Sequence, residues 1–203
     1  MKFLLSGKRD PNPFKISHRE TKAADILSLK LLQLAAAEGF SLRDCVILCI
    51  GTDRSTGDAL GPLVGTQLVR RNADLAVYGT LDEPVHALNL QETLDAIARN
   101  HERPRILAID ACLGQLSSVG CIQLSSGPVM PGAGVNKKLP PVGDMHMTGI
   151  VNVGGFMEYF VLQNTRLSLV FRMAEVMASS ILQALARSAQ FAAAVSRSRL
   201  PRP

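Results

Sequence analysis

Two aspartates stand out among the residues that could do chemistry, because each follows a segment that predicts a buried strand. Asp58 closes the loop 51–58 after the apolar run 45–50, and Asp110 directly follows the apolar run 105–109. A carboxylate at the end of an apolar strand needs hydrogen-bond partners or a chemical task. Each also has an ordinary structural explanation, since Asp58 could cap the helix predicted from residue 59 and Asp110 could cap a loop. Taken singly, neither residue decides between the two roles.

The pair is more informative than either residue alone. If the two strands are neighbours, both carboxylates project into one crevice, because ligand sites of open α/β sheets lie outside the carboxyl ends of the strands. Two close carboxylates either share a proton, which raises one pKa, or bind a cation. A shared proton would let one group act as base and the other as acid when water hydrolyses an acyl bond. Oxygen ligands alone would favour Mg²⁺ or Mn²⁺, whereas an added His146 or His86 would favour Zn²⁺ or Ni²⁺.

Other polar side chains are expected near this edge of the sheet. They are Arg54, Asp82, Glu83, His86, Asp144 and His146. Asp82 and Glu83 have a simpler explanation as a solvated turn. Cys112 raises the alternative of a thiol nucleophile with a histidine as base, although a buried small side chain is the simpler interpretation. The loop 51–58 lacks the Gly-Lys-Ser/Thr ending of a phosphate-binding loop and carries Asp58 instead, which argues against a nucleotide site.

The elements that would position these groups alternate along the chain. Helical spacing predicts helices over 21–38, 59–71, 89–99 and 156–194 (broken near residue 164), and apolar runs predict strands over 45–50, 75–78, 105–109, 120–124 and 147–153. This alternation predicts an α/β fold with a mostly parallel sheet and helices on both faces. The Gly/Pro-rich loop 125–144 exceeds the usual ~12–15 residues of a structureless connection, which indicates function.

Length and composition predict one domain with short ends. The 203 residues are 47% hydrophobic and 19% charged, so a buried core is expected. We predict an irregular basic arm over 1–20, a single α/β domain over 21–194 and a basic tail over 195–203. No apolar run approaches the ~20 residues of a membrane span, and the N-terminus lacks a signal-peptide core. We therefore expect a soluble cytoplasmic protein with reduced cysteines and no membrane partner.

The net charge of +5 belongs to the two ends of the chain. Residues 1–22 hold six basic and two acidic side chains, and residues 176–203 hold four basic and no acidic ones, so each end carries +4. The remaining residues carry −3. A nucleic-acid-binding face would be basic within the folded body and rich in aromatic residues, which are only 4% here. Nucleic acid is therefore a minor hypothesis, and the homo-oligomeric state stays open.

Five long segments resemble the YyaC-type sporulation proteins. They are GTDRSTGDALGPLVGTQL (51–68), YGTLDEPVHALNLQE (78–92), AIDACLG (108–114), GPVMPGAGVNKKLPPVGD (127–144) and TGIVNVGGFMEYFVLQNTRL (148–167). The resemblance runs over about 46–169. That family is similar to the germination protease of spore-formers and, more distantly, to hydrogenase maturation endopeptidases. The resemblance implies a three-layer α/β/α fold.

The resemblance also implies roles for particular residues. The two essential aspartates of the germination protease align with Asp58 and Asp110. Its P-G-S-G-V-x-N-K stretch matches 131–137, which implies substrate contacts for Gly132, Gly134, Asn136 and Lys137. The segment Asp53-Arg54 departs from that pattern, and Arg54 could pair with Asp58 or with a substrate carboxylate. The hydrogenase endopeptidases have metal-binding acids at the positions of Asp58 and Asp110, and His146 is the candidate for their third ligand.

These observations predict a cytoplasmic peptidase of a spore-forming bacterium, acting in the mother cell or forespore. Asp58 and Asp110 would activate water on a protein or peptide substrate, with a divalent metal as an open alternative. Asp53 and Arg54 are further candidates for contacting that substrate. The alternative is a sporulation protein that has lost catalysis and uses the same fold to bind a peptide or protein partner.

Overall fold

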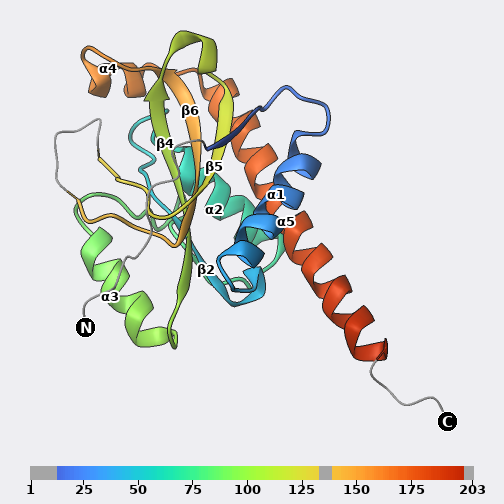
Figure 1. The fold of residues 1–203 in the computed structure, drawn as a ribbon. Coiled ribbons are helices and arrows are strands. Elements are labelled where there is room, and N and C mark those ends of the chain that lie inside the picture. The colour runs from blue at the N-terminus through green and yellow to red at the C-terminus, as the bar shows by residue number, and fades with distance from the viewer. Residues whose placement is uncertain (1–12, 133–138, 199–203) are drawn as a thin grey trace.

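A six-stranded sheet with the strand order β1-β5-β6-β4-β2-β3 runs through the molecule (Figure 1). The computed structural model describes residues 13–132 and 139–198, with side chains up to residue 190. The strands are β1 (Phe14–Ser17), β2 (Cys45–Cys49), β3 (Val77–Tyr78), β4 (Arg105–Gly114), β5 (Cys121–Ser126) and β6 (Met145–Val153). Strands β6, β4, β2 and β3 pair in parallel, and β5 pairs antiparallel with both β6 and β1. The prediction of a mostly parallel sheet is confirmed.

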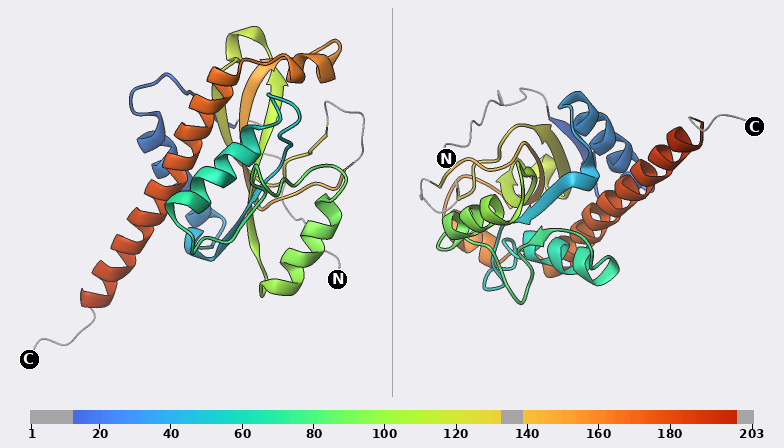
Figure 2. Two further views of the ribbon diagram at one scale, coloured as in Figure 1. Left: turned by 180° about the vertical axis from the view of Figure 1, so that it is seen from behind. Right: turned by 90° about the horizontal axis from the view of Figure 1, so that it is seen from below.

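Helices cover both faces of this sheet. They are α1 (Ala23–Ala37), α2 (Leu60–Arg71), α3 (Leu90–Asn100), α4 (Glu158–Gln163) and α5 (Leu167–Ser198). Helices α1, α2 and α5 pack on one face, and α3 packs on the other (Figure 2). The result is three layers, as expected for an α/β fold whose parallel strands are buried on both sides.

Strand β2 shows why the sequence folds in this way. All five residues of its run CVILC are buried. Because successive side chains of a strand point to opposite faces, Ile47 packs into the core below α1, α2 and α5, whereas Val46 and Leu48 pack into the core below α3. A strand with two apolar faces is stable only between two layers of helices.

Several boundaries differ from the sequence predictions or refine them. The arm 1–20 was expected to be irregular, but Phe14–Ser17 form β1, which pairs with β5. Strand β4 does not end at residue 109 but continues to Gly114. Helix α5 continues to Ser198 and so includes residues assigned to the tail. The predicted helix 156–194 does break near Asn164, since α4 ends at Gln163 and α5 begins at Leu167.

Helix α5 contains the stretch that comes nearest to a membrane span. Leu167–Gln190 is long and apolar enough by length and composition, although the sequence analysis found no such run. Its buried side chains, among them Val170, Met173, Met177 and Ile181, belong to the core shared with α1 and α2. In this stretch 44% is buried within the fold, so core packing accounts for part of its apolar composition.

Candidate functional site

A cavity of about 180 Å³ at the carboxyl end of β4 brings Asp58 and Asp110 together. Asp110 lies on β4, and Asp58 belongs to the loop between β2 and α2. The other lining residues are Ala111, Cys112, Leu113, Val129, Met130, Gly132, Glu158 and Leu162. The crevice expected from the sequence therefore exists, and both carboxyl groups are in its wall.

The loop 51–58 reaches this position because two glycines allow close backbone contacts. Gly51 has φ +150°, and a side chain there would lie 1.9 Å from the carbonyl oxygen of Asp58. The loop closes on itself where the N–H of Thr52 donates to that same carbonyl at 3.2 Å. The N–H of Gly57 donates to the carbonyl of Leu162 at 2.9 Å, which ties the loop to α4. Asp58 is thus held by contacts on both sides.

Asp58 does not serve as the cap of α2. The helix begins at Leu60, and its N-cap residue is Ala59, which makes no side-chain cap hydrogen bond. Asp58 therefore does not have the helix-capping role that was its ordinary structural explanation.

Asp110 lies where β4 loses one of its two neighbours. Strand β2 pairs with β4 only as far as Cys49 and Ile109, and the N–H of Ile50 donates to the carbonyl of Ile109 at 2.7 Å. From Asp110 onward β4 pairs with β6 alone, with Asp110 opposite Thr148. The departure of β2 opens the space into which the carboxyl group points. The sequence analysis placed Asp110 just after the end of its own strand. In the structure, the strand that ends there is the neighbouring β2, while β4 continues to Gly114.

Burial raises the pKa of both carboxyl groups. The pKa of Asp110 rises to about 8, chiefly through desolvation and further through the charge of Asp58, although the N–H of Ala111 donates to its Oδ1 at 2.8 Å and opposes the rise. Desolvation also raises the pKa of Asp58, and the nearby Ser55 hydroxyl counters part of that rise. Among the described residues this buried hydroxyl has no hydrogen bond of good geometry, so its effect on Asp58 is a weak one. At neutral pH Asp110 holds a proton beside Asp58.

Glu158 is a cavity residue that sequence analysis missed. It stands in the first turn of α4, and its Oε1 accepts the N–H of Gly155 at 3.2 Å. An acidic residue in the first turn of a helix is a common stabilising feature, so nothing in the sequence marked it as part of a site.

Cys112 lines the same cavity, but its environment is the reverse of that of a nucleophilic thiol. Burial raises the pKa of Cys112 to about 11, with the charge of Asp110 contributing in the same direction. Reactive cysteines have a lowered pKa, because the thiolate is the nucleophile. The structure therefore disfavours the thiol alternative.

The candidate substrate-binding residues are only partly brought to the cavity. Gly132 lines it. Asp53 and Arg54 are exposed and absent from its lining, and no ion pair joins Arg54 to Asp58 in the part of the chain that the structure describes. Gly134, Asn136 and Lys137 lie outside the described residues.

His146 and Asp144 were expected beside the aspartate pair, and this expectation is wrong. Asp144 directly precedes β6 and His146 is its second residue, so both lie at the amino end of the parallel strands. His146 is paired with Ala108, two residues before Asp110 along β4, and its Nδ1 donates to the carbonyl of Gly127 at 2.9 Å. Of the candidate metal ligands Asp58, Asp110 and His146, only the two carboxylates share the cavity. Within 13–132 and 139–190, no three Asp, Glu, His or Cys side chains are grouped closely enough to hold a metal.

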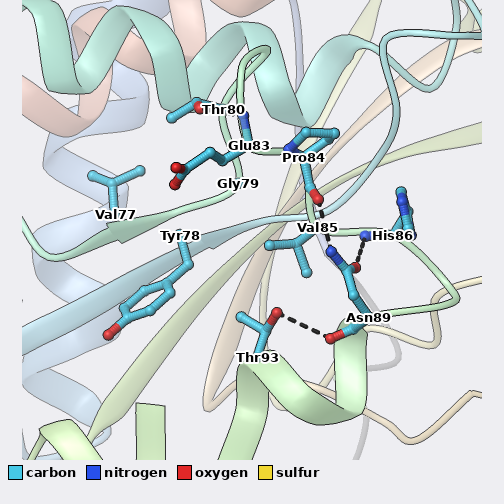
Figure 3. Close-up of a pocket in the computed structure, with 10 residues that line it drawn as sticks. All are labelled: Val77, Tyr78, Gly79, Thr80, Glu83, Pro84, Val85, His86, Asn89 and Thr93. Atoms are coloured by element: carbon cyan, nitrogen blue, oxygen red, sulfur yellow. Dashed lines mark hydrogen bonds between the residues drawn. The ribbon is translucent and has the colours of Figure 1, made fainter. Parts of the chain in front are cut away.

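His86 lies in a second cavity, of about 500 Å³, between β3 and the start of α3 (Figure 3). The N–H of His86 donates to the side-chain oxygen of Asn89 at 2.8 Å, and the amide of Asn89 donates to the carbonyl of Pro84 at 3.0 Å. The Nδ1 of His86 accepts the N–H of Leu88 at 3.3 Å. These bonds make the polar groups part of the local turn, and none of Asp58, Asp110 and Cys112 lines this cavity.

A family model described as "Protein of unknown function (DUF1256)" matches residues 15–180, which is most of the chain. The chain belongs to the DUF1256 family. The "Uncharacterized protein YyaC" of Bacillus subtilis (strain 168) is 52% identical over 168 residues, which cover 82% of this chain and 80% of that relative. The DUF1256 match includes every cavity residue and also most of β1, so it extends beyond the range 46–169 noted from the sequence motifs.

Proposed function

We propose that this member of the DUF1256 family hydrolyses peptide bonds of a protein substrate with Asp58 and Asp110 as an acid–base pair. The observation that carries the proposal is that both carboxyl groups line one small cavity, with Asp110 protonated to about pH 8 beside Asp58. Hydrolysis of an amide needs a base for the water and an acid for the leaving nitrogen. Titratable groups in a cleft with perturbed pKa values are the usual candidates for these tasks.

The two groups divide the reaction between them. Ionised Asp58 takes a proton from a water molecule, whose oxygen forms a bond to the carbonyl carbon of the substrate. Protonated Asp110 donates its proton to the amide nitrogen as the carbon–nitrogen bond breaks. Asp58 then holds the proton that came from water, and proton exchange between the two carboxyl groups restores the starting state. The assignment follows from the order of ionisation, because the charge of Asp58 helps to hold the proton on Asp110.

The role in sporulation is part of the same proposal. It rests on the motif resemblance to the YyaC-type sporulation proteins, while the 52% identity to the uncharacterized YyaC protein of Bacillus subtilis supports the family alone. We propose action in the cytoplasm of the mother cell or forespore, with α5 serving as a core helix.

Digestion of a complex protein mixture tests the proposal, because such a mixture offers many candidate substrates at once. Purified protein is incubated with denatured spore protein extract, and new N-termini are identified by mass spectrometry. The double variant Asp58→Asn/Asp110→Asn is the matched control, since it replaces the carboxyl groups with amides of the same shape. We expect new N-termini with the native protein and none with the variant.

A parallel reaction with a chelator determines whether a divalent metal contributes. Because Asp58 and Asp110 together account for every proton transfer in this reaction, we expect cleavage to persist. Identical peptides from the native protein and the double variant would refute the peptidase proposal and leave the binding alternative.

A further inference from the structure

Four large apolar side chains are exposed within five consecutive residues at the start of α4. They are Phe156, Met157, Tyr159 and Phe160, here called the α4 apolar surface, with exposed fractions of 84%, 52%, 53% and 54%. Tyr159 and Phe160 are in edge-to-face contact, with ring centroids 6.0 Å apart. Since such side chains have about 150–250 Å² of surface each, the four expose roughly 500 Å². The largest apolar patch of a typical monomer covers about 300–600 Å² and is often functional.

The backbone that presents this surface is held in an unfavourable conformation. Met157 has φ +52° and ψ +43°, a left-handed conformation that a large side chain rarely adopts. Gly155, just before it, has φ +136°. Strain of this kind persists where the surrounding structure imposes it, and it is concentrated at sites that bind or react.

Helix α4 also forms part of the wall of the Asp58–Asp110 cavity. Glu158 and Leu162 line the cavity, whereas Tyr159 and Phe160, on the same helix, are exposed to solvent. The carbonyl of Leu162 accepts the N–H of Gly57, the residue before Asp58. Figure 1 shows α4 beside the end of β4, the strand that carries Asp110. The apolar surface therefore lies on the helix that forms part of the cavity wall, on residues other than the two that line the cavity.

The cavity itself is too small to bind a polypeptide with useful affinity. Its volume of about 180 Å³ falls below the ~300–1,000 Å³ of sites that enclose a small-molecule ligand. A protease can obtain the missing affinity from contacts away from the reacting bond. The α4 apolar surface offers such contacts within one helix of the carboxyl groups.

We propose that the α4 apolar surface binds an apolar segment of the polypeptide substrate beside the bond that Asp58 and Asp110 hydrolyse. The inference rests on the proposed function and narrows its substrate class to unfolded or extended segments rich in aromatic and aliphatic residues. A second copy of this chain could also cover the surface. Its place on a helix that lines the cavity favours the substrate, because a segment bound along α4 lies within one helix of the carboxyl groups.

Peptide binding is tested first, in a variant that is expected to bind peptides without hydrolysing them. Asp110→Asn protein is immobilised and exposed to a synthetic library of short peptides of random sequence, and the retained peptides are sequenced. We expect enrichment of Phe, Tyr, Trp, Leu, Ile and Met. The same protein with Phe156→Ser and Phe160→Ser should lose the enrichment and bind a retained peptide at least roughly tenfold more weakly in fluorescence anisotropy, because aromatic anchors dominate such interfaces.

Leu88→Ser, also on the Asp110→Asn background, is the matched control. Leu88 is 82% exposed but belongs to the turn before α3 rather than to α4, so its replacement should leave the enrichment unchanged. Equal loss with Leu88→Ser, or no apolar enrichment at all, would overturn the inference. So would sedimentation showing a dimer that Phe156→Ser/Phe160→Ser dissociates.

Hydrolysis of a retained peptide by the native protein separates this inference from the proposed function. We expect Phe156→Ser/Phe160→Ser to raise KM for that peptide with little change in kcat. Cleavage of peptides without any apolar preference would overturn the inference and leave the peptidase. Apolar enrichment without any hydrolysis by the native protein would overturn the peptidase and, with it, the substrate role of the surface.

Discussion

Two aspartates interact with β4, Asp144 at its amino end and Asp110 within the strand toward its carboxyl side, and their surroundings are opposite in kind. At the amino end, Asp144 accepts hydrogen bonds from the Arg105 guanidinium and the N–H of Ile106, both at 2.8 Å. At the carboxyl side, Asp110 accepts only the N–H of its own neighbour Ala111 among the described residues, and it faces a second acid instead of a cation. Asp144 joins β4 to the loop before β6, which is a structural task.

The partners of a carboxylate therefore identify its task better than its position after an apolar run. A carboxylate with a cation and a backbone donor stabilises the fold in its ionised form. A carboxylate buried beside another acid destabilises the fold when ionised, and such an arrangement persists where the protonated form has a use. Asp110 and Asp144 should consequently respond in different ways to the same substitution.

The largest contrast is expected in hydrolysis. Asp58→Asn and Asp110→Asn should each lower kcat by about 10²–10⁴-fold, because each removes the acid or the base of the reaction. Asp144→Asn is the matched control and should change kcat by less than about twofold. The measurement is the rate of cleavage of one peptide found in the spore-extract digestion. Equal losses in all three variants would show that Asp110 and Asp144 do not differ in function.

The pH dependence of kcat should depend on Asp58 and Asp110 and not on Asp144. Because the pKa of Asp110 is about 8, its protonated form is lost above that pH, and kcat should then fall about tenfold per pH unit. The decline at low pH reports protonation of Asp58. Rates measured from about pH 4 to about pH 10 check this, with Asp144→Asn as a profile that should superimpose on that of the native protein. A rate that stays constant above about pH 8 would contradict the role of Asp110 as acid.

Replacing Asp110 and replacing Asp144 should change the free energy of unfolding in opposite directions. The folded protein keeps a proton on Asp110 up to about pH 8, whereas the unfolded chain loses it near about pH 4. The folded state therefore binds more protons across this window, so its stability falls as the pH rises from about 4 to about 8. Asp110→Asn removes this penalty and should raise the free energy of unfolding at about pH 9 by about 2–4 kcal/mol.

Asp144→Asn should instead lower the free energy of unfolding, by about 1 kcal/mol, because its partly exposed ion pair with Arg105 is lost. Urea unfolding at about pH 5 and about pH 9 measures both effects. Destabilisation by Asp110→Asn at the higher pH would mean that its ionised form is satisfied in the fold after all.

The smallest effect is expected from removing the basic C-terminal end. Truncation after Ala194 removes three of the four C-terminal arginines and the last turn of α5, far along the chain from the cavity residues. Cleavage rates should stay within about twofold of the native rate. A large loss of activity with the fold intact would show that the C-terminal arginines contribute to hydrolysis.

The layers and the aspartate pair could be predicted from the sequence for identifiable physical reasons. The run CVILC in β2 is apolar on both faces, which only a strand between two helical layers satisfies. Asp58 follows β2, and Asp110 lies on the neighbouring parallel strand β4, so their meeting depends only on strand order.

The remaining features depend on contacts that local sequence does not encode. The extension of β4 to Gly114 results from pairing with β6. Strand β1 forms because it can pair with β5, far away in the sequence. His146 was misplaced because a residue at the start of a parallel strand lies at the amino edge of the sheet, opposite to the residues that follow strands. Glu158 came to the cavity through the packing of α4, a tertiary contact without a local pattern.

The central claim is that Asp110 holds a proton at neutral pH because it is buried in the cavity that it shares with Asp58. Carboxyl carbon NMR of protein labelled with ¹³C at aspartate follows each ionisation directly and does not depend on catalysis, with Asp110→Asn identifying the resonance. The account predicts that Asp110 titrates near about pH 8 and that Asp58→Asn lowers this pKa. Titration of Asp110 near about pH 4, unchanged by Asp58→Asn, would contradict it.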